Sequence, residues 1–373
     1  MANIFINGFN SKAGGGKSIL KNYLKMLSRR KLPDHYFVLT PENQKYIDFA
    51  CEWVSFVDVP AFYKKIVLFW YVNRYVLPNL LKTYKIDIVF NLSDVVIPTH
   101  TKQLFLFDWA YAVFPKSVAW KRMDLKGFVQ RRTKLYLFKM YMRYADIVIA
   151  QTDVMKSELQ SVYSLENVTI VPNAVSLENI DPGCNIDFGL PHGKKLLYIT
   201  HYYTHKNIEI FIPLAQKIKQ LGYEYKLITT IDKKQHAQAR RFLYDVKRLG
   251  LNSIIHNVGS VRMEHVPSLY RQCDALLMPT LLESFSGTYV EAMFHKIPII
   301  TSDFSFAHGV CRDGAFYFDP LDSDDILDKI NTVFFDKKLR MNKLQAAQEV
   351  LHDFMSWEQV FELFQALLDK MKY

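Results

Sequence analysis

Two glutamates in the second half of the chain flank a small polar loop, and their spacing suits the binding of a phosphorylated sugar. Glu283 and Glu291 stand eight positions apart, and the loop between them follows the apolar run ALLMPT. Small residues at 284–288 predict a loop and a helix N-terminus, whose free N–H groups favour a diphosphate. A carboxylate in the helix suits paired ribose hydroxyls, and one at the loop suits a sugar. The alternative is a surface acid and a helix acid without a ligand.

A glycine run near the N-terminus, AGGGKS at residues 13–18, is a second candidate phosphate loop. It follows an apolar run and opens a helix, so Gly15 and Gly16 would let backbone N–H groups approach a phosphate. The P-loop pattern G-x-x-x-x-G-K-[ST] fits the end of the run, but its first glycine would fall at Ser11. We therefore expect a loop near a phosphate or sugar, or a plain tight turn, in preference to an ATP- or GTP-hydrolysing site.

The positive charge is concentrated in the first half of the chain. Residues 1–180 hold 24 Lys and Arg against 14 Asp and Glu, which accounts for the whole net charge of +10. Segment 61–85 has five basic residues and no acid, and segment 115–145 has nine basic residues and one acid, both with interleaved aromatics. Such segments suit an anionic membrane surface. Two surface helices with core-facing aromatics, or a nucleic-acid site, are the alternatives; of the two ligands we expect the membrane and no nucleic acid.

Composition places the chain among ordinary globular proteins. Its 373 residues are 50% hydrophobic and 23% charged, which excludes a disordered or collagen-like chain and allows two or three domains. Four cysteines show no metal-ligand spacing, and we expect neither disulfides nor a bound metal. We also read no signal peptide and no membrane-spanning segment. These features predict a cytoplasmic protein.

Short apolar runs typical of buried parallel strands alternate with helix-like segments in both halves. The runs lie at residues 3–6, 34–40, 86–91, 103–107, 146–150, 169–171, 195–200, 225–230, 253–258, 275–278 and 298–300. A stretch at 176–195, rich in Pro and Gly, interrupts the alternation. The pattern predicts an α/β protein of two Rossmann-like, doubly wound domains, 1–178 and 192–355, facing across a deep cleft. Ligands of such sheets bind beyond the carboxyl ends of the strands.

Several short segments of the sequence resemble those of one protein family. Residues 196–325 resemble the nucleotide-binding domain of the GT-B glycosyltransferases of retaining family 4, the group 1 glycosyl transferases. Glu283 and Glu291 match the E-x7-E motif of that family. The other matching words are LYITHYYTHKN (197–207), VGSV (258–261), LYRQCDALLMPTLLESFSG (269–287), EAM with IPIITSD (291–303) and GAFYFDPLDSDD (314–325). The first half is similar more loosely, through ADIVIAQTDVMKSEL (145–159) and VPNAV (171–175).

The resemblance implies where the donor diphosphate sits. Lys206 matches the lysine that pairs with the diphosphate in this family. His201 stands where the family usually has an arginine, so a histidine replaces a permanently charged side chain. How the charge of the diphosphate is neutralised at this position is therefore open. Backbone N–H groups of the loop would meet the phosphates. These loop residues are Phe285, Ser286, Gly287 and Thr288.

The resemblance also implies roles for the remaining site residues. Glu283 would contact the donor sugar, and Glu291 would hold the ribose. Val261 and Arg262 lie where the base sits. In the first half the family often has a His-Asp step; here it reads Phe107-Asp108, so Asp108 is retained and would help orient the acceptor hydroxyl. The fold implies that the C-terminal helix, 357–373, packs back on the first domain.

Taken together, these features predict a metal-independent, retaining glycosyltransferase that needs no cofactor. Its donor would be a nucleoside diphosphate sugar, UDP-linked in preference to GDP-linked. Its acceptor would be a glycan, lipid-linked at the inner membrane face, as in bacterial surface polysaccharide or lipopolysaccharide synthesis. The protein would then be peripheral, binding the anionic membrane through 61–85 and 115–145. The alternatives are an NDP-sugar epimerase on the same fold, or a non-catalytic protein that binds a sugar or nucleotide.

Overall fold

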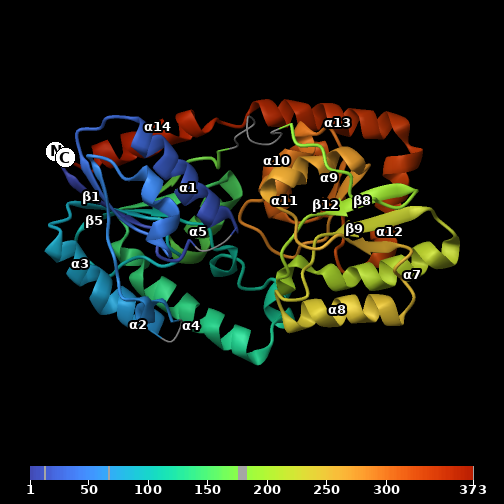
Figure 1. Ribbon diagram of the computed structural model, residues 1–373, viewed down its shortest axis with the longest axis horizontal. Helices are drawn as coiled ribbons and strands as arrows, with labels where there is room; N and C mark the ends of the chain where they lie inside the picture. The colour runs from blue at the N-terminus through green and yellow to red at the C-terminus, as the bar shows by residue number, and fades with distance from the viewer. Residues whose placement is uncertain (12–13, 66–67, 175–182, 373) are drawn as a thin grey trace. The chain divides into compact units, whose positions relative to one another are not determined.

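The chain folds into two α/β units, seen in a computed structural model that describes residues 1–11, 14–65, 68–174 and 183–372 (Figure 1). Unit 1 comprises Met1–Pro115, Asp124–Ala174 and Met355–Tyr373, and unit 2 comprises Lys116–Met123 and Val175–Phe354. Parts of three expected features lie outside the described residues: the start of the glycine run, positions 66–67 of segment 61–85, and positions 176–182 of the break with the boundary at 178.

Unit 1 is built on a seven-stranded parallel sheet with the order β3-β2-β1-β4-β5-β6-β7. The order reverses between β1 and β4, which is where open sheets of this type place their ligands. The strands are β1 (Asn3–Asn7), β2 (His35–Leu39), β3 (Val54–Phe56), β4 (Ile88–Asn91), β5 (Lys102–Leu106), β6 (Ile147–Ala150) and β7 (Val168–Ile170).

Unit 2 repeats the plan with six parallel strands in the order β10-β9-β8-β11-β12-β13. Here the reversal lies between β8 and β11. The strands are β8 (Lys194–Tyr198), β9 (Tyr225–Thr229), β10 (Ile255–Asn257), β11 (Ala275–Met278), β12 (Ile299–Ser302) and β13 (Ala315–Phe318). The prediction of two doubly wound parallel sheets is thus confirmed.

Helices connect the strands in both units. Those of unit 1 are α1 (Gly14–Arg29), α2 (Phe69–Tyr71), α3 (Leu77–Thr83), α4 (Leu125–Tyr141), α5 (Asp153–Tyr163) and α14 (Trp357–Lys370), with short turns η1 (Asn43–Phe49), η2 (Ala61–Lys64), η4 (Val72–Val76), η5 (Ala110–Ala112) and η7 (Met142–Tyr144). Those of unit 2 are α7 (Phe211–Leu221), α8 (Ala237–Arg248), α9 (Val266–Gln272), α10 (Gly287–Phe294), α11 (Ser305–Cys311), α12 (Ser323–Phe335) and α13 (Lys337–His352), with turns η6 (Val118–Arg122), η8 (Thr204–Lys206), η9 (Ile208–Ile210), η10 (Met263–His265) and η11 (Arg312–Gly314).

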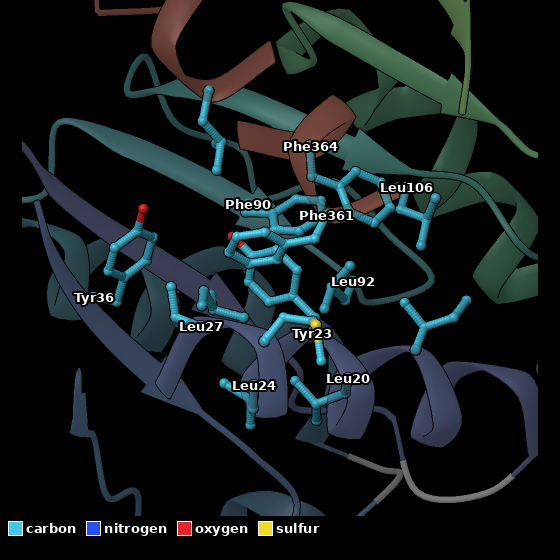
Figure 2. Close-up of a cluster of buried hydrophobic side chains, with 14 of the residues drawn as sticks. Leu20, Tyr23, Leu24, Leu27, Tyr36, Phe90, Leu92, Leu106, Phe361 and Phe364 are labelled. Atoms are coloured by element: carbon cyan, nitrogen blue, oxygen red, sulfur yellow. The ribbon is translucent and has the colours of Figure 1, made fainter. Parts of the chain in front are cut away.

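The C-terminal helix α14 completes the core of unit 1, although it follows the whole of unit 2 in sequence. Phe361 and Phe364 pack on Tyr23 of α1, with ring centroids 5.3 and 5.9 Å apart (Figure 2). Gln365 links two buried tyrosines, accepting from Tyr36 Oη at 2.9 Å and donating to Tyr23 Oη at 2.8 Å. Burial of these rings and satisfied polar groups explains why the last helix folds with the first unit.

Two strands and one helix were not recognised in the sequence. The strands β3 and β13 are edge strands of three and four residues, VSF and AFYF, which are too short to show a periodicity. The helix α11 is only seven residues long. The DxD-like string before α12 caps that helix, since the Asp322 side chain accepts from the Asp324 N–H at 2.8 Å.

Segment 115–145 is divided between the two units. The η6 turn packs with unit 2, and the Ser117 side chain, its N-cap, donates to the Leu281 carbonyl at 3.3 Å. Trp120 of that turn is buried. The rest of the segment forms α4 and η7 in unit 1. The two halves of this basic segment therefore belong to different structural units, a division that its charge pattern did not indicate.

Candidate functional site

An ion pair between Lys206 and Glu283 lies at the centre of the candidate site in unit 2. Lys206 follows β8 in the η8 turn, and Glu283 follows β11. These strands are neighbours at the point where the sheet order reverses, so the loops at their carboxyl ends meet. The Lys206 ammonium contacts Glu283 Oε1, and the two side chains are 16% and 12% exposed. The site therefore presents a cation and a carboxylate with little water around them.

The backbone around Lys206 is fixed by its neighbours. The Tyr198 hydroxyl donates to the Lys206 carbonyl at 2.8 Å. Asn207 adopts a left-handed conformation with φ 55°, which asparagine tolerates better than most residues. Its buried amide donates to the carbonyls of Pro279 and Pro320 at 3.1 and 2.8 Å. These bonds join three loops and hold the lysine in place.

Thr280 is a site residue that sequence reasoning missed. Its hydroxyl lies 3.0 Å from Glu283 Oε1, and the Thr280 side chain is fully buried. It thus helps to orient the carboxylate that the lysine neutralises. Its position just after a buried strand was the only signal available, and a threonine there has many other uses.

The loop after Glu283 leads into α10, as the small residues indicated. Ser286 is the N-cap in extended conformation, and α10 begins at Gly287. The first N–H groups of a helix have no intrahelical partner, and the helix dipole makes this end attractive to an anion. A Cβ built on Gly287 would meet no described atom within 4 Å. The loop Phe285–Thr288 therefore offers an accessible helix N-terminus directly behind the ion pair.

Glu291 lies one turn into α10, where it is half-buried. The Tyr270 hydroxyl of α9 lies 2.9 Å from Glu291 Oε2. Burial raises the pKa of Glu291, and the hydrogen bond from Tyr270 opposes that rise. The carboxylate therefore faces one fixed donor and keeps acceptor capacity for a ligand, because a carboxylate has about four acceptor sites.

The other predicted donor-site residues are more exposed. His201 follows β8, and its Nδ1 lies 2.7 Å from the Gln235 side-chain amide, a partner that the sequence did not reveal. Arg262 forms an ion pair with Glu264 at 3.3 Å, and the Arg262 side chain is 75% exposed. Val261 is half-buried beside it. The structure therefore brings Lys206 and Glu283 into contact, whereas Arg262 pairs with Glu264.

A second constellation of charged groups lies in unit 1. Asp108 follows β5, and a Cβ built on Gly16 of α1 would lie 3.4 Å from its Oδ2. Desolvation raises the pKa of Asp108 to about 7, and the nearby Asp94 carboxylate adds to this, while Lys134 lowers it. Lys134 contacts Asp94, and its ammonium lies 4.1 Å from the ring centroid of Trp109. Gly15 lies in the same helix turn as Gly16, with no described atom within 4 Å of an added Cβ.

Exposed aromatic residues gather on α2 and η4 in unit 1. Trp70, Tyr71 and Tyr75 are 47%, 42% and 49% exposed. The Arg74 guanidinium lies 5.4 Å from the ring centroid of Tyr75. Burial raises the pKa of Tyr141 at the end of α4, and the charge of Arg74 opposes that rise. We call Trp70, Tyr71, Arg74 and Tyr75 the aromatic surface.

The aromatics of both basic segments are thus divided between core and solvent. Phe138 and Tyr141 face the core, while Phe128 and Tyr136 of the same helix are 39% and 65% exposed. Among the described residues, no helix combines the length and apolar character needed to cross a bilayer. The same part of the chain contains no group of three His, Cys, Asp or Glu side chains suited to a metal ion.

Residues 188–350 match the family model for glycosyl transferases group 1. This stretch of unit 2 is therefore similar to the domain that defines the group 1 glycosyl transferases. The matched range contains the ion pair, the α10 loop and Glu291. It lies wholly within unit 2, so the family match describes this domain.

Curated relatives resemble the chain at low identity. The Schizosaccharomyces pombe phosphatidylinositol N-acetylglucosaminyltransferase gpi3 subunit is 22% identical over 60% of this chain. The uncharacterized glycosyltransferase MJ1178 of Methanocaldococcus jannaschii is 26% identical over 63%. The matched stretches cover only 48% and 61% of those two proteins, so this chain spans less than two thirds of the length of either relative.

Solved structures match both units. Sucrose-phosphate synthase from Thermosynechococcus elongatus has a TM-score of 0.75 at 15% identity, covering 100% of this chain and 99% of that one. Anabaena HepE, in complex with UDP and glucose, has a TM-score of 0.70 at 15% identity, covering 99% and 100%. WaaG, a glycosyltransferase of lipopolysaccharide biosynthesis, gives 0.70 at 16% identity, covering 97% of this chain and 99% of WaaG. The fold around the group 1 domain is therefore GT-B.

Proposed function

We propose that this protein is a retaining glycosyltransferase that transfers a sugar from a UDP-linked donor to a glycan acceptor. The observation that carries the proposal is the shielded ion pair of Lys206 with Glu283, set beside the N-terminus of α10. A leaving nucleoside diphosphate gains negative charge as the glycosidic bond breaks. A preorganised cation and helix N-terminus stabilise that charge where it develops.

Each donor-site residue then has a chemical role. Lys206 and the N–H groups of Phe285–Thr288 bind the diphosphate. Glu283 exchanges its contact with Lys206 for one to the donor sugar, where its charge stabilises an oxocarbenium-like centre. Glu291 accepts from the ribose hydroxyls, and Val261 and Arg262 flank the base. Binding of UDP by Anabaena HepE supports the choice of uracil.

The transfer step balances without a nucleophile on the protein. The bond between the anomeric carbon and the β-phosphate oxygen breaks as the acceptor oxygen bonds that carbon on the same face. The acceptor proton passes to the leaving phosphate oxygen, and UDP departs. We assign the acceptor to unit 1, where Asp108 orients its hydroxyl. Gly15 and Gly16 keep the role proposed from the sequence, in which backbone N–H groups at the start of α1 approach a phosphate or sugar.

The acceptor we propose is lipid-linked, and the aromatic surface brings the protein to an anionic membrane, as surface polysaccharide synthesis at the inner membrane face would require. Exposed rings with a basic residue between them suit the interface of such a membrane. The name of the fission yeast relative, a phosphatidylinositol N-acetylglucosaminyltransferase subunit, supports a lipid acceptor. The excess of basic residues in segments 61–85 and 115–145 supports the anionic partner.

Nucleotide binding is the first test of the donor site. Metal-free thermal unfolding with UDP, GDP and ATP should show a shift with UDP, because a ligand that binds only the folded state stabilises it by about 2.7 kcal/mol at a hundredfold excess over its Kd. The Lys206→Met variant should lose most of the shift. No shift with UDP or GDP would refute the donor site, and a shift with ATP alone would favour the P-loop alternative.

Product analysis tests the reaction. With a UDP-sugar and a glycan acceptor, we expect release of UDP in the presence of EDTA and an α-linked product from an α-linked donor, read by NMR. Glu283→Gln should bind UDP and lower the rate about 100-fold, as loss of one stabilising group does. Conversion of the donor sugar without acceptor would indicate the epimerase alternative, and UDP binding without turnover would indicate the non-catalytic one.

Vesicle sedimentation tests the membrane surface. The protein should sediment with anionic phospholipid vesicles at low salt, and high salt should release it. Substituting Trp70→Ser with Tyr75→Ser should weaken binding. Tyr244→Ser, which removes an even more exposed ring from unit 2, should not weaken it. Absence of binding to anionic vesicles at low salt would contradict the proposal. Binding to RNA but not to vesicles would indicate that the basic segments bind nucleic acid instead of a membrane.

A further inference from the structure

Tyr270 is a buried residue of α9 that touches α10 at two levels. Its side chain is 0% exposed, and its hydroxyl lies 2.9 Å from Glu291 Oε2 and 3.2 Å from the Thr288 carbonyl. A hydroxyl has one proton, and a bond to a charged acceptor is the stronger choice. Figure 1 shows α9 and α10 next to each other in unit 2. The hydroxyl therefore donates to Glu291 and fixes its carboxylate relative to α9.

The ring of Tyr270 is held as well as its hydroxyl. It stacks on His295, with ring centroids 5.0 Å apart and the planes inclined by 10°. His295 follows Glu291 by four positions at the end of α10, so the two residues lie on the same face of the helix. Tyr270 is thus held against one face of α10 both by its hydroxyl and by its ring.

We propose that Tyr270 is the positioning residue for Glu291, holding its carboxylate in the orientation that receives the ribose hydroxyls of the donor. This inference rests on the proposed donor site. One oxygen of the carboxylate is anchored by the tyrosine, and the remaining acceptor capacity is directed at the ligand. Burial disfavours the charged form of Glu291 and the tyrosine bond opposes this effect, which supports the assignment.

A purely structural role makes a different forecast. If Tyr270 only fills the core, its loss loosens unit 2 and lowers the affinity of the site for every ligand equally. If it positions Glu291, its loss affects only ligands that carry ribose hydroxyls. The 2′,3′-dideoxy form of UDP lacks those hydroxyls and keeps the base and diphosphate, so it separates the two roles.

The chain offers a matched control for the loss of a buried hydroxyl. Tyr289 of α10 is also 0% exposed, and its hydroxyl lies 2.8 Å from Thr301 Oγ1. Tyr289→Phe therefore removes a buried hydrogen-bonding hydroxyl next to the same loop without touching Glu291.

The experiment is calorimetric titration of the full chain and its variants with UDP and with 2′,3′-dideoxy-UDP. The wild type should prefer UDP by roughly tenfold or more, as hydrogen bonds to a charged group do. Tyr270→Phe should lower the UDP affinity by about that factor and leave the dideoxy affinity unchanged. Tyr289→Phe should keep the wild-type preference. Combining Tyr270→Phe with Glu291→Gln should give the same preference as Glu291→Gln alone, because the tyrosine acts through the glutamate.

Two results would overturn the inference, and a third would also refute the donor site on which it rests. If Tyr270→Phe lowers the affinity for both ligands equally, Tyr270 has only a structural role in the core. If the preference for UDP is unchanged, Tyr270 does not position Glu291. If the wild type binds neither nucleotide, the proposed donor site itself fails. Should Tyr270→Phe fail to fold, His295→Leu removes the ring stacked on Tyr270 and loosens the tyrosine. A reduced preference for UDP with the dideoxy affinity unchanged would then support the inference, and equal weakening of both ligands would overturn it.

Discussion

Lys206 and Glu283 are 77 positions apart in the sequence and form an ion pair whose side chains are only 16% and 12% exposed. Each of the two charges is shielded from water and depends on the other. The pair is therefore a joint feature of the loops after β8 and β11, and its members should not behave as independent residues.

Single and double substitutions of this pair should be strongly non-additive. Lys206→Met and Glu283→Gln should each lower the free energy of unfolding by about 1–3 kcal/mol, since each strands a partly buried partner. The double variant should lose less than the sum of the two. Urea unfolding of the four proteins measures the coupling. Additive losses would mean that the contact contributes nothing to stability.

Asp108 should make stability fall as the pH rises. Burial next to Asp94 raises its pKa from 3.8 to about 7, so the folded state resists ionisation that the unfolded state accepts. The contribution of the neutral carboxyl is full below about pH 4 and is lost as the pH rises to about 7. Asp108→Asn should therefore match the wild type near pH 4 and be more stable at pH 8.

Urea unfolding of both proteins between pH 4 and 8 provides the measurement. A third protein, Lys134→Met, removes the charge that lowers the Asp108 pKa and should move the loss of stability to higher pH. Parallel curves for the wild type and Asp108→Asn across this range would show that Asp108 ionises normally.

The last helix should be essential to unit 1. Phe364 is 3% exposed and packs on Tyr23 and Phe90, so Phe364→Ala should cost about 3–5 kcal/mol of unfolding free energy. Lys370→Ala on the exposed face of α14 serves as the control, with an expected change within about 0.5 kcal/mol. Hydrogen exchange should show the loss of protection in the strands of unit 1. A loss confined to α14 would mean that the helix frays independently.

Restoring an arginine after β8 should strengthen nucleotide binding. His201→Arg supplies the permanent charge that group 1 relatives usually carry there, so we expect a severalfold tighter Kd for UDP, weakened by salt. His192→Arg adds the same charge at an exposed position before β8, at the other end of the strand, and should leave the Kd unchanged. If both variants tighten binding equally, general charge is responsible, and position 201 has no direct contact with the diphosphate.

The sequence alone predicted the alternation of strands and helices, because buried parallel strands need continuous apolar runs and α10 needs a loop of small residues before it. It also placed the central candidates, Glu283, Glu291 and Lys206, through their motif. The edge strands β3 and β13 were not predicted, because segments of three or four residues are too short to show a periodicity. The partners Thr280 and Tyr270 escaped notice because a threonine or a tyrosine near a strand has many uses.

Tertiary structure alone decided which distant segments come together. Local periodicity specifies an element, whereas the packing of its face depends on every other element of the core. This is why the sequence could not reveal that Gln365 of α14 joins Tyr23 and Tyr36, that η6 leaves its basic segment for unit 2, or that Asp94 and Lys134 flank Asp108. The type and spacing of each candidate residue indicated the chemistry it could perform. Its charge state and orientation depend on neighbours that lie up to hundreds of positions away in the sequence.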